Sequence, residues 1–220
     1  MNYLKKSIDT TFGLVIICSF LATFNSYPAF WLVKQGLFMK ESLGFQMSVT
    51  LSGIFLMLVI PILVIKYILD KKPEDFGLRL PDSIRQAVIL TFTVTMIFLP
   101  IIFLLAKQRS FQQYYQINTG IIGFSIITII QFFYFLSEEF FFRGFLFLSL
   151  WNKIKYHSFW LTNLVFAIFH ITKPGGEILF AFFFGTSLSY LTYKTKSFVP
   201  ALFAHFMFAL LLNILVNFVY

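Results

Sequence analysis

The chain has 220 residues, of which 59% are hydrophobic and only 12% are charged, and its mean hydropathy is +0.83. Long apolar runs with so little charge exclude an ordinary soluble domain and predict a polytopic membrane protein. The net charge of +8 is spread over short loops, as topogenic charge is, so we expect no nucleic-acid partner.

Seven apolar segments follow one another and are predicted to be membrane-spanning helices. They run from about 12 to 33, 43 to 69, 86 to 106, 120 to 151, 158 to 171, 177 to 193 and 198 to 220. The first resembles a signal peptide, but no small-residue cleavage site follows it and further spans do, so we interpret it as a span. The fourth exceeds the ~20 residues that a crossing helix needs, so it must tilt, bend or protrude.

Several features interrupt these helices. Residues 25–28 break the first span, and Pro61 predicts a kink in the second. The segment 70–82 is the most polar stretch and is predicted to be a solvated loop. Because no repeat or linker divides the chain, residues 1–220 are predicted to form one all-α membrane domain.

The distribution of Lys and Arg over alternate loops predicts the orientation in the membrane. The loops on the side of the N-terminus carry eleven of these residues, and the loops on the opposite side carry five. We therefore predict that the N-terminus is cytoplasmic.

Two adjacent carboxylates and an arginine lie inside the fourth apolar segment, at Glu138, Glu139 and Arg143. Each ionisable group at the centre of a membrane helix costs roughly 2.5–3.5 kcal/mol, so this group predicts a functional site. On a helix, Glu139 and Arg143 share a face and Glu138 points about 100° away. Arg143 can therefore neutralise one carboxylate and leave the other for a different neighbour. The alternative is an ion pair that only fixes helix packing, which does not require the second glutamate.

Two histidines are predicted to lie near these carboxylates. The fourth and fifth segments form a hairpin across residues 152–157, and Glu138 and His170 lie at similar distances from that loop. At 1.5 Å per residue both are ~20 Å from the same membrane face. His205 is ~10 Å from the start of the last segment, which is shallower but within reach if that helix tilts.

The residue types allow more than one chemistry. A carboxylate surrounded by apolar groups suits a general base that acts on water, and histidines can position the water or stabilise an oxyanion. A glutamate with two histidines is also a possible zinc set, but the three ligands come from separate helices without a paired histidine motif. We therefore expect no metal and no other cofactor. A proton-relay transporter also fits such a cluster, although no inverted repeat supports it.

Three ordered motifs resemble a known family. Glu-Glu-x3-Arg (Glu138, Glu139, Arg143), Phe-x3-His (Phe166 to His170) and a histidine in the final helix (His205) are similar to those of the CAAX-protease and bacteriocin-processing family. This family, also called the Abi family, consists of intramembrane endopeptidases.

The resemblance covers roughly residues 130–213, within a motif-bearing core of about 120–213, and has a weaker counterpart at residues 76–81. It implies an all-helical membrane fold, with a family core of eight helices around a cavity. It also implies a bacterial membrane enzyme that hydrolyses a peptide bond in a peptide or membrane-protein substrate within the lipid bilayer.

The resemblance also implies a role for each motif residue. Glu138 would be the general base, with Glu139 beside it and Arg143 holding the pair. His170 would help to position the water, and His205 would help to stabilise the oxyanion. The structural picture of the family favours a glutamate mechanism without a metal.

The sequence departs from the family pattern in its last motif, His-x3-Asn, because the fourth residue after His205 is Ala209. Asn213 lies one helical turn further, ~6 Å deeper, and is the remaining candidate for oxyanion support. Because the sequence ends at Tyr220, we also expect the short eighth helix of the family to be absent. A catalytically inactive relative that acts as an immunity or scaffold protein is the alternative that Ala209 supports.

Overall fold

The computed structural model describes residues 2–39, 42–117 and 119–220, with side chains from residue 12 onward. All regular elements in these ranges are helical, which confirms the predicted all-α class. They are α1 (Asn2–Ala22), α2 (Tyr27–Lys34), α3 (Leu43–Gly53), η1 (Ile54–Val59), α4 (Ile60–Leu63), η2 (Val64–Ile68), η3 (Pro73–Phe76), α5 (Ile84–Ala106), α6 (Arg109–Tyr115), α7 (Gly120–Glu139), η4 (Phe140–Phe147), α8 (Leu148–Ile154), α9 (His157–Ile168), α10 (Glu177–Thr195) and α11 (Val199–Phe218). The elements η1, η2 and η4 are π-helical, and η3 is a 3-10 helix.

Five segments in the described ranges are long and apolar enough to cross a membrane, so the chain is a polytopic membrane protein as predicted. They are Phe12–Lys34, Leu43–Ile68, Ile84–Ala106, Gly120–Ile154 and Val199–Phe218. The fifth and sixth predicted spans correspond to α9 and α10 and differ from the expectation. With 12 residues, α9 is only ~18 Å long, well short of the ~30 Å of a bilayer core. The 19 residues of α10 are long enough but include too many serine, threonine and tyrosine side chains to be as apolar as the five spans.

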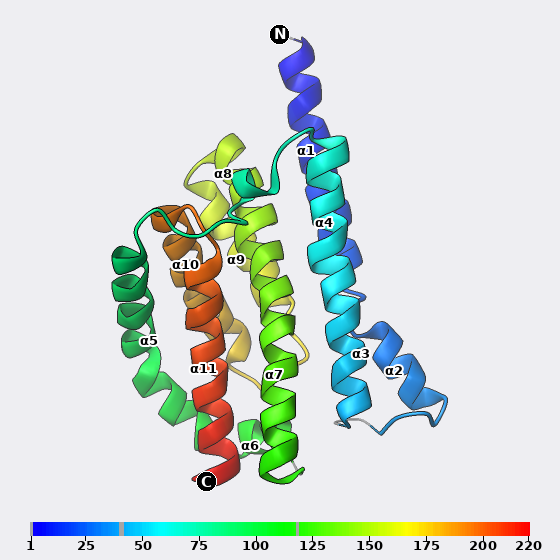
Figure 1. Cartoon of the computed structure of the whole chain (residues 1–220), viewed down its shortest axis with the longest axis vertical. Helices are drawn as coiled ribbons and strands as arrows, with labels where there is room; N and C mark the ends of the chain where they lie inside the picture. Colours follow the sequence, from blue (N-terminus) through cyan, green and yellow to red (C-terminus); the bar gives the residue numbers. More distant parts are fainter. Residues whose placement is uncertain (1, 40–41, 118) are drawn as a thin grey trace.

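The helices form two groups on either side of α7 (Figure 1). On one side, α3 packs against α7, and α1 contacts η1 and α8. On the other side, α11 packs between α5 and α7, and α10 contacts α9, α11 and η4. The π-helical element η4 continues α7 and is buried over its whole length, so the long fourth segment carries the Glu-Glu-x3-Arg motif into the middle of the molecule.

The predicted interruption at residues 25–28 is present, because α1 ends at Ala22 and α2 begins at Tyr27. The Asn25 side chain donates a hydrogen bond of 2.8 Å to the Tyr134 hydroxyl on α7. Around Pro61 the helix continues, with π-helical turns on both sides. A polar residue between α1 and α2 therefore attaches this N-terminal part of the chain to α7.

The charged residues of segment 70–82 are exposed, as its polarity predicted, but the middle of the segment is buried. Phe76 is only 3% exposed and packs on Phe145, with ring centroids 6.3 Å apart. The backbone N–H of Phe198, at the start of α11, donates to the Gly77 carbonyl at 3.3 Å. The middle of this segment therefore inserts between helix ends and covers the start of α11.

The predicted approach of His205 to the glutamates is confirmed, although the sequence placed His205 nearer to the membrane face. The expectation placed Phe198 at the membrane face, level with the loop between the fourth and fifth segments. In the structure, α8 extends beyond the start of α11, which lies under segment 70–82 (Figure 1). As a result, His205 lies beside the glutamates of α7 instead of above them.

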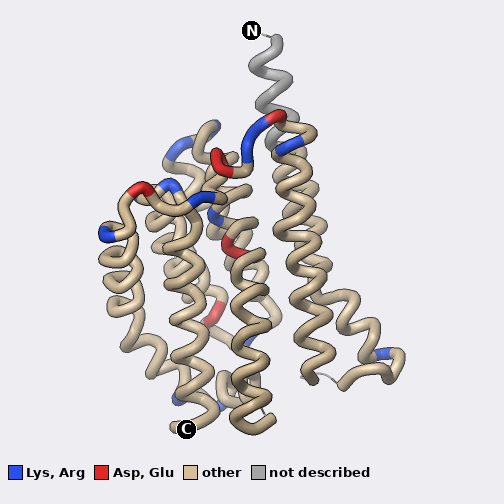
Figure 2. The backbone as a smooth tube through the Cα atoms, in the orientation of Figure 1, with Lys and Arg blue, Asp and Glu red and all other residues tan. Residues whose placement is uncertain are grey.

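Basic residues gather at the end of the bundle that carries segment 70–82 (Figure 2), which fits the predicted charge asymmetry. Three residues counted for that prediction, Lys5, Lys6 and Lys40, lie outside the described side chains. Lys173 was assigned to an external loop, but it contacts Glu177 at 3.0 Å in the wall of an internal cavity. The orientation itself stays a prediction.

The contact between segment 70–82 and η4 can be tested at Gly144. A Cβ atom added there would lie 2.5 Å from the Phe76 carbonyl oxygen, so backbone would have to move. We expect Gly144→Ala to lower the free energy of unfolding by about 1–3 kcal/mol, as overpacked sites do. Thermal unfolding in detergent measures the effect.

Gly13 on α1 provides the matched control, because no atom lies within 4 Å of a Cβ added there. Gly13→Ala should keep or raise stability through its helix propensity. A Gly144→Ala protein that melts like the wild type would contradict the described packing.

Candidate active site

The centre of the site is an ion pair between Glu139 and Arg143, which the four-residue spacing predicted. The Nε atom of Arg143 donates to Oε2 of Glu139 at 3.1 Å, and neither residue is exposed. The guanidinium also donates from Nη1 to Oδ1 of Asn163 at 2.9 Å and lies 4.4 Å from the centroid of the Phe166 ring. Three elements, η4, α9 and the end of α7, therefore hold one buried cation.

Gly185 on α10 leaves the space that this arrangement occupies. A Cβ atom there would approach Oδ1 of Asn163 to 2.7 Å and Nη2 of Arg143 to 3.1 Å. Asn163 also donates to the Ser189 hydroxyl at 3.2 Å. Asn163 was not among the predicted site residues, although an amide side chain in an otherwise apolar segment is a sign of a buried polar contact.

His205 of α11 joins the two glutamates. Its Nδ1 atom is 2.7 Å from Oε1 of Glu139 and 3.8 Å from Oε2 of Glu138. One carboxylate, that of Glu139, therefore binds both Arg143 and His205. The carboxylate of Glu138 is less engaged, and its residue is 4% exposed.

His170 lies in the turn after α9 and faces a different carboxylate from the one predicted. Its Nδ1 atom is 2.8 Å from the Phe166 carbonyl oxygen, which can only accept, so Nδ1 carries the hydrogen. Its Nε2 atom is 3.9 Å from Oε1 of Glu177. The structure therefore brings His205 to the glutamate pair and places His170 beside Glu177.

A second polar cluster surrounds Glu177, the first residue of α10. Its carboxylate accepts from the Tyr115 hydroxyl at 2.8 and 2.9 Å and pairs with Lys173 at 3.0 Å. Glu177 is 6% exposed. The sequence analysis treated Lys173 as a loop residue and Glu177 as the start of a span. No local spacing rule predicts this pair, because Lys173 lies in the turn before α10 and only Glu177 is helical.

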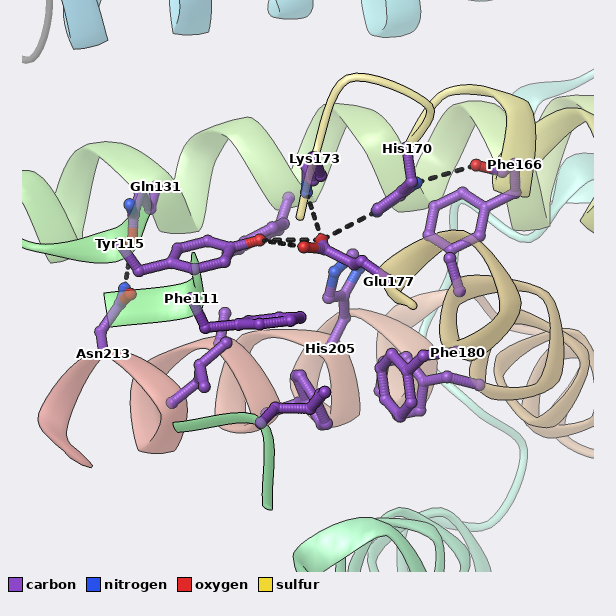
Figure 3. Close-up of a pocket in the computed structure, with 17 residues that line it drawn as sticks. Phe111, Tyr115, Gln131, Phe166, His170, Lys173, Glu177, Phe180, His205 and Asn213 are labelled. Carbon is purple, nitrogen blue, oxygen red and sulfur yellow. Dashed lines mark hydrogen bonds and ion pairs between the residues drawn. The ribbon is translucent and has the colours of Figure 1, made fainter. Parts of the chain in front are cut away.

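A cavity of about 60 Å³ lies between the Glu177 cluster and His205 (Figure 3). It is lined by Leu105, Phe111, Tyr115, Gln131, Phe135, Phe166, His170, Lys173, Glu177, Phe180, Ala181, Phe184, His205, Phe208, Ala209, Leu212 and Asn213. A volume of this size holds water molecules where polar groups face it. Among the described residues that line it, His205 is the one that also contacts the Glu138 and Glu139 carboxylates.

Among the described residues, Glu138, Glu139 and His205 form the group that most resembles a set of metal ligands. Their ligand atoms lie within 4.8 Å of one another. However, both oxygens of Glu139 and the Nδ1 atom of His205 are already joined to each other or to Arg143. The arginine cation also repels a second cation, so this donor set as arranged does not fit zinc, which needs four ligands at about 2.0–2.2 Å.

The comparison with protein families agrees with the motifs. Residues 118–211 match the family described as type II CAAX prenyl endopeptidase Rce1-like. This segment is therefore similar to that family. The match confirms the resemblance that the three motifs predicted, and it spans Glu138, Glu139, Arg143, His170 and His205. No curated protein and no solved structure matches the chain.

The Glu139–Arg143 pair predicts a large loss of stability for Glu139→Gln. This change removes the charge that compensates a fully buried guanidinium, and breaking such a pair typically costs about 3–5 kcal/mol. Glu138→Gln is the matched control, because Glu138 makes no direct contact with Arg143 closer than 4 Å among the described residues. Equal unfolding midpoints for Glu139→Gln and wild type would contradict the pairing.

Proposed function

We propose that the protein is an intramembrane endopeptidase that hydrolyses a peptide bond with a water molecule activated by Glu138. The observation that carries this proposal is the buried group of Glu138, Glu139, Arg143 and His205 beside a cavity, inside an Rce1-like segment. The substrate class is a peptide or membrane protein that enters from the lipid bilayer.

Glu138 is the better general base of the two glutamates. Glu139 already accepts from Arg143 and His205 in charge-assisted hydrogen bonds, which favour its ionised form and make it a weak proton acceptor. Glu138 has one such neighbour at the longer distance of 3.8 Å. As the water oxygen attacks the carbonyl carbon, Glu138 takes the water proton. It then passes this proton to the amine nitrogen as the C–N bond breaks.

The other residues hold the reacting groups. His205 lines the cavity and is fixed by Glu139, and we propose that it stabilises the oxyanion. His170 lines the same cavity from the turn after α9, where it positions the attacking water. Arg143 keeps Glu139 ionised and in place.

A catalytically inactive relative that acts as an immunity or scaffold protein is the second candidate. Ala209 favours it, because it lines the cavity one turn beyond His205 and offers no hydrogen-bond donor there. For both candidates we propose an integral protein of a bacterial cell membrane with a cytoplasmic N-terminus, in agreement with the basic end of the bundle.

Glu138→Gln tests the proposed base. The change keeps the side-chain volume and removes the proton acceptor, so we expect peptide hydrolysis to fall by at least about 10²-fold, with insertion and folding retained. Hydrolysis is measured by mass spectrometry after an apolar peptide library is incubated with the purified protein in nanodiscs.

Glu74→Gln is the matched control, because Glu74 is exposed on η3. Wild-type turnover by Glu138→Gln would overturn the assignment. Activity should also survive exhaustive chelation; a loss that zinc restores would instead assign Glu138 and His205 to a metal.

Ala209 tests whether a missing oxyanion donor limits the reaction. Losing one such donor typically costs about 10²–10³ in turnover, so Ala209→Asn should raise kcat by at least about tenfold. Ala209→Leu, which adds similar volume without a donor, is the control and should not raise it. If Asn213 supplies the donor instead, Ala209→Asn adds nothing and Asn213→Ala sharply lowers kcat.

A further inference from the structure

Two amide side chains face the cavity at the end away from His170. The Nδ2 atom of Asn213 on α11 donates to Oε1 of Gln131 on α7 at 2.9 Å, and both residues line the cavity. In Figure 3 this pair lies at one end, with His170 at the other and His205 between them. Asn213 is 3% exposed, so its side chain is enclosed by protein.

The hydrogen bond between the two amides uses one of their four N–H donors and one of their four acceptor lone pairs. It leaves the N–H donors on Nε2 of Gln131 and lone pairs on Oδ1 of Asn213. No residue in the described part of the chain forms a hydrogen bond with either of these atoms. The pair therefore presents free N–H donors beside a free acceptor oxygen, which together complement a single peptide group.

A peptide at this end of the cavity needs such partners. Each backbone N–H or C=O that leaves water without a hydrogen bond costs several kcal/mol, and lipid offers no replacement. The neighbouring side chains Phe111, Leu105 and Leu212 offer none either. Gln131 and Asn213 are thus the groups at this end of the cavity that can bind a peptide backbone.

We propose that Gln131 and Asn213 bind one peptide group of the substrate main chain, about three residues from the bond that is cleaved. This inference rests on the proposed function. Gln131 precedes Glu138 by seven positions on one helix, which is ~10 Å along its axis. An extended peptide covers that distance in about three residues at ~3.3 Å each. The pair contacts the main chain only, so it adds affinity without selecting side chains.

The test uses dye-labelled apolar decapeptides that bind to the Glu138→Gln protein in nanodiscs. In each peptide one backbone amide is replaced by an ester, which removes one N–H donor and weakens one carbonyl acceptor. We expect a single ester position to weaken binding by about 3–10-fold, which corresponds to one net hydrogen bond. In the variant with Gln131→Met and Asn213→Leu added, the same ester should cost nothing.

The comparison of peptides separates recognition from a structural role. If Gln131 and Asn213 only join α7 to α11, the added substitutions lower stability and weaken all peptides alike. In that case the ester penalty persists, or no position shows one, and the proposal is wrong. Failure of every decapeptide to bind would also overturn it. If the double variant does not fold, the absence of any ester penalty in the Glu138→Gln protein still overturns the proposal.

Hydrolysis of the same peptides by the wild-type protein separates this inference from the proposed function. Mass spectrometry locates the cleaved bond, and the sensitive ester should lie about three residues from it. Cleavage without a position-specific ester penalty leaves the endopeptidase standing and removes the main-chain contact. A position-specific penalty without cleavage keeps the contact and refutes the endopeptidase.

Discussion

The arrangement of the site depends on one buried cation, Arg143. A guanidinium that is fully removed from water is tolerated only where charge and hydrogen bonds compensate it. Glu139 supplies the charge and Asn163 accepts one hydrogen bond, while Gly185 leaves the space. Because Glu139 also holds His205, the same pair fixes the histidine of the last helix.

Phe166 links this group to the other wall of the cavity. Its ring lies against the guanidinium of Arg143, and its carbonyl oxygen accepts from His170. The two histidines are therefore positioned by neighbouring parts of one framework, although they come from different elements. The part that requires a phenylalanine is the ring, which lies between the Arg143 guanidinium and the His170 ring, 4.6 Å from the latter.

The sequence predicted the features that depend on local spacing. The helical class and the Glu139–Arg143 pair follow from hydropathy and from a four-residue separation. Features that depend on tertiary packing escaped it. His205 was predicted to lie within reach of the glutamates but nearer to the membrane face, because the sequence does not show that Phe76 of segment 70–82 is buried. The partner of His170 was missed because α9 ends early, so that its turn lies inside the molecule beside Glu177.

Segment 70–82 contacts both the helix that carries Arg143 and the solvent. Its ends are exposed and carry most of its charge, while Phe76 lies directly over Gly144, the residue after Arg143. A helix turn deep in the bundle therefore shares a contact with a loop that water-soluble molecules can reach. A molecule that binds or displaces this loop would therefore alter the packing of the helical turn that carries Arg143.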